Sequence, residues 1–213
     1  MSSRAAPSPT PTPPRGGARG ALIAAAHQLV KRQGYAATSV DDICRAAGVT
    51  KGAFFHHFAS KEALAVAAAE GWTARAAPLF DLPPYARLAD PLDRVLGHID
   101  FRASLIAGAA EDYTCFVGTM VQEAHASSEP IRAASDASIT AYATRLADDI
   151  AAAIAEHGTA APVDAIDLAY HVQAVLQGAF VIAKAKGDPA AARASVAHLK
   201  RYVAMLFGRG EKT

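Results

Sequence analysis

Cysteine, aromatic residues and long apolar runs are all scarce in this chain of 213 residues. The two cysteines, Cys44 and Cys115, lie far apart and have no partner at metal-ligand spacing, which argues against a zinc site or a disulfide framework. No uninterrupted apolar run reaches the length that crosses a bilayer, so we expect no membrane partner. Prolines stand where a signal peptide would place apolar residues, which predicts a cytoplasmic protein.

The sequence also lacks the motifs of common enzymes. It contains no nucleophile elbow, no P-loop and no HExxH motif. The adjacent His56 and His57 could suggest a metal site, but neighbouring side chains on a helix diverge. We therefore expect no catalytic site, no bound metal and no cofactor.

Alanine is abundant in the chain, and 52% of the residues are hydrophobic. Alanine is the best helix former, and runs of β-branched residues are short, so the sequence predicts an all-α fold of about nine helices. Charge is unevenly divided: residues 1–65 carry eight Lys or Arg and three Asp or Glu, whereas the remainder is net acidic. A basic unit joined to an acidic one suggests a polyanionic partner for the first part.

Three segments follow from composition and periodicity. Residues 1–18 are rich in proline and predict a disordered tail. Residues 19–65 predict a three-helix domain, and residues 66–213 a larger helical domain. Within the larger domain we expect helices over 90–108, 112–125, 129–158, 162–186 and 188–207, after a loop at 81–84.

Local signals in the small domain predict a helix-turn-helix. A helix over 19–33 ends at Gly34, and overlapping Ser/Thr-x-x-Asp arrangements at Thr38 and Ser39 start a second one. Gly48 permits a sharp turn, and Thr50 can cap a third helix over 51–57. The third helix of such a motif presents its N-terminal residues to DNA.

The stretch 38–64, TSVDDICRAAGVTKGAFFHHFASKEAL, resembles the DNA-binding signature of the TetR/AcrR family of transcriptional regulators. The resemblance extends from about residue 19 to 68. Weaker similarity continues at 115–120 (CFVGTM), 176–179 (LQGA) and 187–189 (GDP), which resemble one branch of the family's ligand domain. The resemblance implies an N-terminal helix-turn-helix DNA-binding domain followed by a ligand-binding and dimerisation domain.

The family implies a set of DNA contacts at matching positions. Most would bind phosphates, and Ala53 and His56 would face the bases. Phe55 departs from the family, which commonly has tyrosine there. The expected DNA-binding residues are Thr38, Thr50, Lys51, Gly52, Ala53, Phe55, His56, His57 and Lys61.

In the larger domain the resemblance implies a homodimer built by the last two helices, and a cavity for an effector. The helix over 168–185 is apolar on opposite sides, and we expect Leu176 to lie in the dimer interface. No basic cluster is visible, which disfavours a highly anionic ligand such as a nucleotide, and we expect a neutral or weakly polar, aromatic or lipophilic effector. Its lining is predicted to be Phe101, Tyr113, Met120, His125, Tyr142, His171 and Phe180.

The favoured function is therefore a ligand-responsive regulator, a repressor released from a palindromic operator by a small molecule. Two alternatives stay open at this point. The hairpin could serve protein contacts in a helical ligand-binding or adaptor protein. An enzyme ranks third, because no paired catalytic residues are visible.

Overall fold

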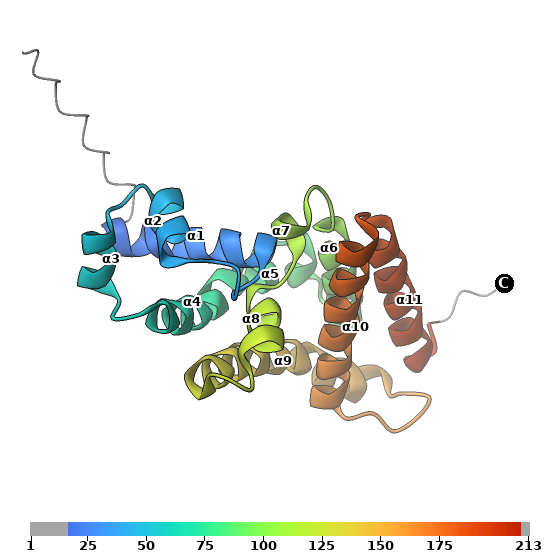
Figure 1. The fold of residues 1–213 in the computed structure, drawn as a ribbon. Helices are drawn as coiled ribbons and strands as arrows, with labels where there is room; N and C mark the ends of the chain where they lie inside the picture. The colour runs from blue at the N-terminus through green and yellow to red at the C-terminus, as the bar shows by residue number, and fades with distance from the viewer. Residues whose placement is uncertain (1–16, 210–213) are drawn as a thin grey trace, which may run out of the picture.

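A computed structural model describes residues 17–209, and these residues form helices and loops without a strand. Within residues 17–209, nine α-helices have seven or more residues, in agreement with the predicted number, and two single-turn α-helices and one 3-10 turn join them. The bounds are α1 Gly17–Gln33, α2 Val40–Ala47, α3 Lys51–His57, α4 Lys61–Ala76, α5 Pro78–Asp81, η1 Pro84–Arg87, α6 Pro91–Ser104, α7 Ala110–Tyr113, α8 Phe116–Ala124, α9 Glu129–His157, α10 Ala165–Lys186 and α11 Ala190–Leu206. Figure 1 shows α1–α3 at one end of the molecule and α10 and α11 at the other.

Three local expectations are corrected. A disordered tail was predicted over residues 1–18. Residues 1–16 of it lie outside the described part of the chain, and Gly17 and Ala18 belong to α1. The loop expected at 81–84 is flanked by helical turns, because Pro78 and Pro84 both favour the first turn of a helix. The single helix expected over 112–125 is split into α7 and α8, since Thr114 and Cys115 adopt extended backbone angles.

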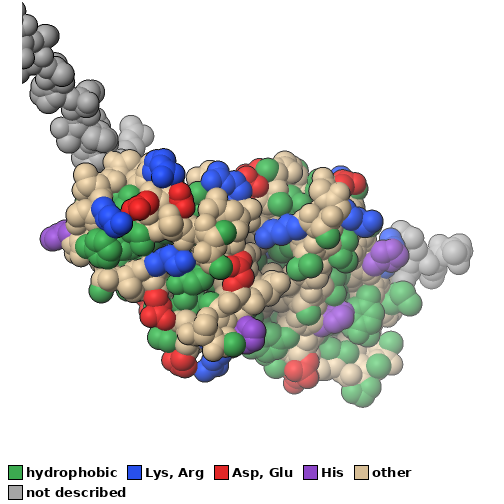
Figure 2. Space-filling model, in the orientation of Figure 1, with side chains coloured by type: hydrophobic (Ala, Val, Ile, Leu, Met, Phe, Trp, Pro, Cys, Tyr) green, Lys and Arg blue, Asp and Glu red, His purple; other side chains and the backbone are tan. Residues whose placement is uncertain are grey.

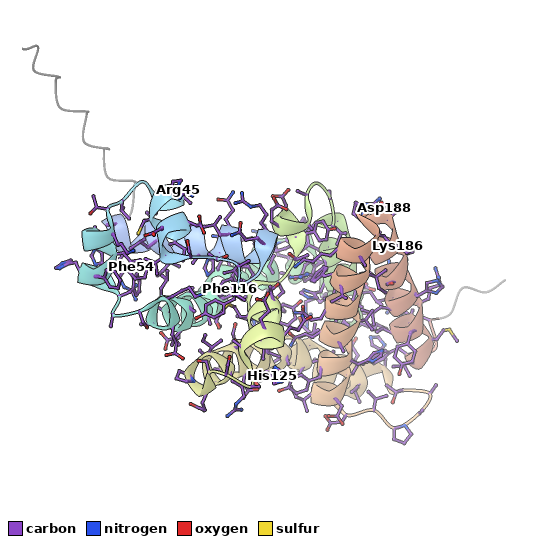
Figure 3. The ribbon with its side chains drawn as sticks, in the orientation of Figure 1. Arg45, Phe54, Phe116, His125, Lys186 and Asp188 are labelled. Atoms are coloured by element: carbon purple, nitrogen blue, oxygen red, sulfur yellow. The ribbon has the colours of Figure 1, made fainter. Side chains whose placement is uncertain are left out.

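Helices α1–α3, which we call the reading head, enclose a small apolar core. Leu22, Ile43 and Phe54 are almost fully buried in it, and the start of α4 closes it with Leu64. In Figure 3 Phe54 points from α3 into this core, whereas Arg45 points outward from α2. Phe54 and Phe58 are thus core residues, and this core sets how α3 is presented.

Helices α1 and α4 also join the reading head to the rest of the chain. The His27 Nε2 atom on α1 lies 2.9 Å from the Ala68 carbonyl oxygen on α4, and the imidazole packs edge-on against Trp72 and Phe116. Burial lowers the pKa of His27, which keeps the ring neutral. Since α4 runs without interruption from 61 to 76, it passes directly from the reading head into the larger domain.

The larger domain packs α6, α9, α10 and α11 around the main apolar core, represented by Val95, Leu146, Val172 and Val196. By length and mean hydropathy α10 is a candidate membrane span. Core helices of soluble proteins have the same properties, and one face of α10 packs against α9 and α11. The finding is therefore weak evidence for a membrane segment.

Candidate functional site

The caps of the helix-turn-helix hold α3 at a fixed angle. Ser39 begins α2 with a capping box, in which its hydroxyl accepts from the Asp42 N–H and the Asp42 carboxylate accepts from the Ser39 N–H. Gly48 ends α2 in the left-handed conformation, with φ of 66°. Thr50 then caps α3 by accepting from the Ala53 N–H at 3.1 Å. Capping on both sides of the turn orders a seven-residue helix that would be marginal alone.

The structure brings seven of the nine predicted DNA-binding residues to one exposed surface, which we call the α3 face. Lys51 is ion-paired with Asp41 at 3.0 Å, but both side chains are more than half exposed. Such a pair contributes little stability, so a phosphate can replace Asp41 at small cost. Ala53 is partly exposed and the others are exposed: Thr50, Lys51, Gly52, Phe55, His56 and His57.

Thr38 does not belong to the α3 face, and this corrects the sequence prediction. Its side chain is 1% exposed, and its hydroxyl donates to the Gly34 carbonyl oxygen at 2.6 Å. Its N–H is also occupied, because it donates to the Tyr35 carbonyl oxygen. With both donors used inside the protein, Thr38 shapes the α1–α2 loop and offers no group to a phosphate.

Lys61 lies beside the α3 face, at the start of α4, and has a structural contact that the sequence did not indicate. Its ammonium donates to the carbonyl oxygens of Tyr35 and Thr38, both at 3.1 Å, and lies 4.1 Å from the centroid of the Tyr35 ring. Burial lowers its pKa. The positive charge therefore fastens the start of α4 to the α1–α2 loop, and the third N–H of the ammonium stays available, so its contact with a phosphate remains a prediction.

Behind the reading head lies a cavity of about 230 Å³, which we call the junction cavity. Lys31 from the end of α1 and Trp72 and Arg75 from α4 form its wall on the side of the reading head. Helices α6, α7, α9 and α10 complete it. Three residues predicted as effector lining do line it, namely Tyr113, Tyr142 and Phe180.

The other four predicted lining residues lie elsewhere. Phe101 packs beside Tyr85, and Met120 is fully buried in the core between α1, α4 and α8. His125 is exposed at the end of α8, as Figure 3 shows, and His171 is exposed on α10. Helical periodicity shows which residues share a face, but it does not show which face meets a cavity.

The charge of the junction cavity also corrects our expectation. Lys31, Arg75 and Arg102 are brought together from three separate helices, with Asp112 as the one acidic residue in the lining. Among the described residues none of these three cations forms an ion pair. The sequence hid this cluster because its members are separated by dozens of residues.

Tyr142 connects the junction cavity to a buried polar chain. The Tyr142 hydroxyl lies 2.6 Å from His98 Nε2, and His98 Nδ1 lies 2.7 Å from the Tyr85 hydroxyl, which donates to the Leu79 carbonyl oxygen. Burial lowers the pKa of His98 to about 3, so the ring is neutral. Because Tyr85 uses its one hydrogen on Leu79, His98 must donate through Nδ1 and accept from Tyr142 through Nε2.

The outer face of α10 and α11 carries large apolar side chains that nothing in the described chain covers. Figure 2 shows hydrophobic side chains gathered over these helices. They are exposed by 39% to 65% and comprise Tyr170, Val181, Ile182, Tyr202 and Met205. Leu176 is not among them: it is 3% exposed and lines the junction cavity, so it cannot lie in a dimer interface as we predicted.

Asp90, Glu156 and His157 form one cluster of metal-ligand type, with ligand atoms within 4.8 Å of one another. Asp90 already caps α6, accepts a hydrogen bond from His157 and is ion-paired with Arg209. These contacts join the start of α6 to His157 at the end of α9 and to Arg209 after α11. They explain why the three side chains lie close together without a bound ion.

A helix-turn-helix exposed at one end, with a cavity against its supporting helix, defines a helical transcriptional regulator that binds DNA. Residues 22–68 match the family described as bacterial regulatory proteins, tetR family, and residues 91–199 match the tetracyclin repressor-like C-terminal domain. The chain belongs to the TetR family, as the sequence resemblance predicted. The family consists of regulators and not of enzymes.

Individual relatives agree with this assignment. The chain is 43% identical over 49 residues to the transcriptional regulator YerO of Bacillus subtilis, spanning 23% of this chain and 17% of that protein. It is 31% identical over 137 residues to the transcriptional regulator AcuR of Cereibacter sphaeroides, spanning 60% of this chain and 63% of that one. The crystal structure of regulatory protein TetR from Rhodobacter sphaeroides is 26% identical, with a TM-score of 0.76 over 87% of this chain and 98% of that chain.

Proposed function

We propose that this chain is a cytoplasmic, ligand-responsive repressor, which binds a palindromic operator as a homodimer and releases it when a small molecule fills the junction cavity. One observation carries the proposal. Helix α4 packs under the reading head at its start and lines the junction cavity with Trp72, Arg75 and Ala76 at its end. A ligand in that cavity therefore touches the element that supports the DNA-reading helix.

The homodimer supplies the second half of the mechanism. Pairing of α10 and α11 with the same helices of a second copy would cover the exposed apolar face and place two reading heads on successive major grooves. A ligand shifts operator binding only if it prefers the conformer in which the two heads are out of register. The match of residues 91–199 to a repressor-like domain supports repression over activation.

Gly52 provides a sharp test of the DNA-binding surface. A Cβ atom built on Gly52 meets only the Thr50 hydroxyl oxygen, at 3.8 Å, so the protein itself has room for a side chain there. We expect Gly52→Ala to keep or raise thermal stability, because alanine favours a helix by up to about 1 kcal/mol. We also expect it to lower operator affinity by about tenfold or more, since the added methyl group keeps α3 from approaching DNA.

The operator for this test is selected from a random DNA pool with the full chain, and affinity is measured by fluorescence anisotropy. Gly71→Ala is the matched control, because Gly71 is also helical and exposed and an added Cβ meets nothing within 4 Å. Equal operator affinity for Gly52→Ala and Gly71→Ala would contradict the α3 face. Selection of no sequence at all would favour an adaptor role for the hairpin.

A further inference from the structure

The junction cavity holds two buried polar atoms that lack a partner. Arg102 Nε and Thr114 Oγ1 are fully buried and form no hydrogen bond to any described residue. Both residues belong to the lining of the junction cavity. A buried donor without an acceptor costs free energy, so such groups mark a place where a ligand supplies the missing acceptor.

The surrounding charge shows which acceptor fits. Lys31 and Arg75 add two cationic side chains to Arg102, and Asp112 is the one acidic residue in the lining. The Asp112 carboxylate already accepts from the Ala109 N–H at 3.0 Å. Burial, and next the charge of Arg75, lower the pKa of Lys31, while Asp112 and Glu111 act in the opposite direction.

Tyr142 cannot serve as the donor in this cavity, because its hydroxyl hydrogen goes to His98. The rest of the lining is mostly apolar, with Trp72, Leu79, Leu105, Tyr113, Leu176 and Phe180, but the amide side chains of Gln173 and Gln177 also belong to it. A volume of about 230 Å³ holds roughly eight groups the size of a water molecule. The lining thus combines three cationic side chains with a largely apolar surface.

We propose that the effector is a small organic anion, a monocarboxylate with a compact apolar body, whose carboxylate is bound by the Arg102 guanidinium and the Thr114 hydroxyl. This inference rests on the proposed function, because it names the chemical class of the effector. It replaces the neutral lipophilic effector that the sequence suggested. Arginine is suited to the task because its planar group donates to carboxylates in a fixed geometry.

The test compares acids with their neutral amides: butyrate with butyramide, benzoate with benzamide, and phenylacetate with phenylacetamide. Binding to the full chain is measured by thermal shift and calorimetry at constant ionic strength, up to about 10 mM. At least one acid is expected to raise the melting temperature and to bind about tenfold or more tightly than its amide. Amides that bind as well as acids, or three acids that leave the melting temperature unchanged, overturn the proposal.

Two variants separate a ligand contact from a structural role. Arg102→Met and Thr114→Val each keep the approximate shape of the side chain and remove the unpaired donor. Both are expected to weaken the acid by about tenfold or more and to leave the melting temperature of the free protein unchanged or higher. The control Arg87→Met removes an exposed arginine outside the junction cavity and should change neither value. If Arg102→Met lowers the melting temperature of the free protein and leaves acid binding unchanged, Arg102 stabilises the fold and does not bind the ligand.

Operator binding without acid is measured in the same samples. If the protein binds operator DNA but does not distinguish acids from amides, the proposed anion site is wrong and the proposed regulatory function stands. If the protein binds the acid but selects no DNA, the anion site stands and the proposed regulatory function is wrong.

Discussion

At the residue scale, two lysines of the same sequence motif have different tasks. Lys51 is exposed and pairs loosely with Asp41, whereas Lys61 is partly buried and holds two carbonyl oxygens of the α1–α2 loop. The difference lies in what surrounds each ammonium group. A charged donor that satisfies otherwise unpaired carbonyls is worth more to folding than an exposed ion pair.

Lys61→Met is therefore expected to destabilise the protein by about 1–3 kcal/mol, because two carbonyl oxygens lose a charged donor. The measurement is the free energy of unfolding from urea titration. Lys51→Met, the matched control, should leave that free energy within about 0.5 kcal/mol of the parent and lower operator affinity instead. The opposite pattern, with Lys61→Met stable and Lys51→Met unstable, would reverse the two assignments.

At the scale of single elements, α10 shows how one helix serves two surfaces. Leu176 and Phe180 face the junction cavity, while Val181 and Ile182 face outward with 49% and 42% of their side-chain surface exposed. A helix that is apolar on both sides must be buried on both sides. The protein buries one side, and a second copy is proposed to bury the other.

Ile182→Asp is expected to dissociate the homodimer, because a carboxylate without a partner in an apolar interface costs several kcal/mol. Sedimentation velocity over a range of concentrations measures the shift toward monomer. Leu82→Asp is a suitable control, since Leu82 is 74% exposed but lies outside α10 and α11. If Ile182→Asp sediments as the parent protein does, the interface lies on another face.

At the scale of the whole molecule, the buried chain Tyr142–His98–Tyr85 joins α9, α6 and the connection between α4 and α6. Gly97 helps by leaving room on α6, because a Cβ atom there would lie 2.5 Å from the Tyr85 Cβ atom. His98 is buried at the centre of this chain, so a neutral ring is needed to donate to one tyrosine and to accept from the other. Protonation of this ring is consequently linked to folding.

Stability should therefore fall as the pH is lowered from 6.5. In the unfolded chain His98 binds a proton near pH 6.5, whereas in the folded protein burial holds its pKa at about 3. Between these values the unfolded state binds more protons, which costs about 1.4 kcal/mol of stability per pH unit. His27 acts in the same direction, because its pKa is also lowered by burial.

Urea denaturation of the parent protein and of His98→Asn at several pH values from 6.5 to 5 checks this expectation. The variant should show a smaller loss of stability per pH unit. If His98→Asn does not fold, the histidine ring resonances of the parent answer the same question by NMR. A His98 ring that becomes protonated above pH 5 in the folded protein would contradict the buried neutral assignment.

The sequence by itself determined the local structure and the family. Caps at Ser39 and Thr50, glycine at Gly48 and alternating apolar faces are short-range signals, so the helix-turn-helix and the α3 face were predicted from them. Two contacts of this region were not predicted. The Thr38 hydroxyl donates to the Gly34 carbonyl oxygen, and the Lys61 ammonium donates to the Thr38 carbonyl oxygen, which lies 23 residues away in the sequence. The DNA contacts of the α3 face stay predictions.

Only the tertiary structure decided the chemistry of the cavity and the dimer face. Periodicity assigns residues to a face of their own helix, but the rotation of each helix is fixed by packing with the others. For that reason Met120 lies in the core, Leu176 lies at the cavity, and Arg102 and Lys31 line the same cavity from different helices. Charges that converge from distant positions have no local signature, because the electrostatic force between them acts through space and not along the chain.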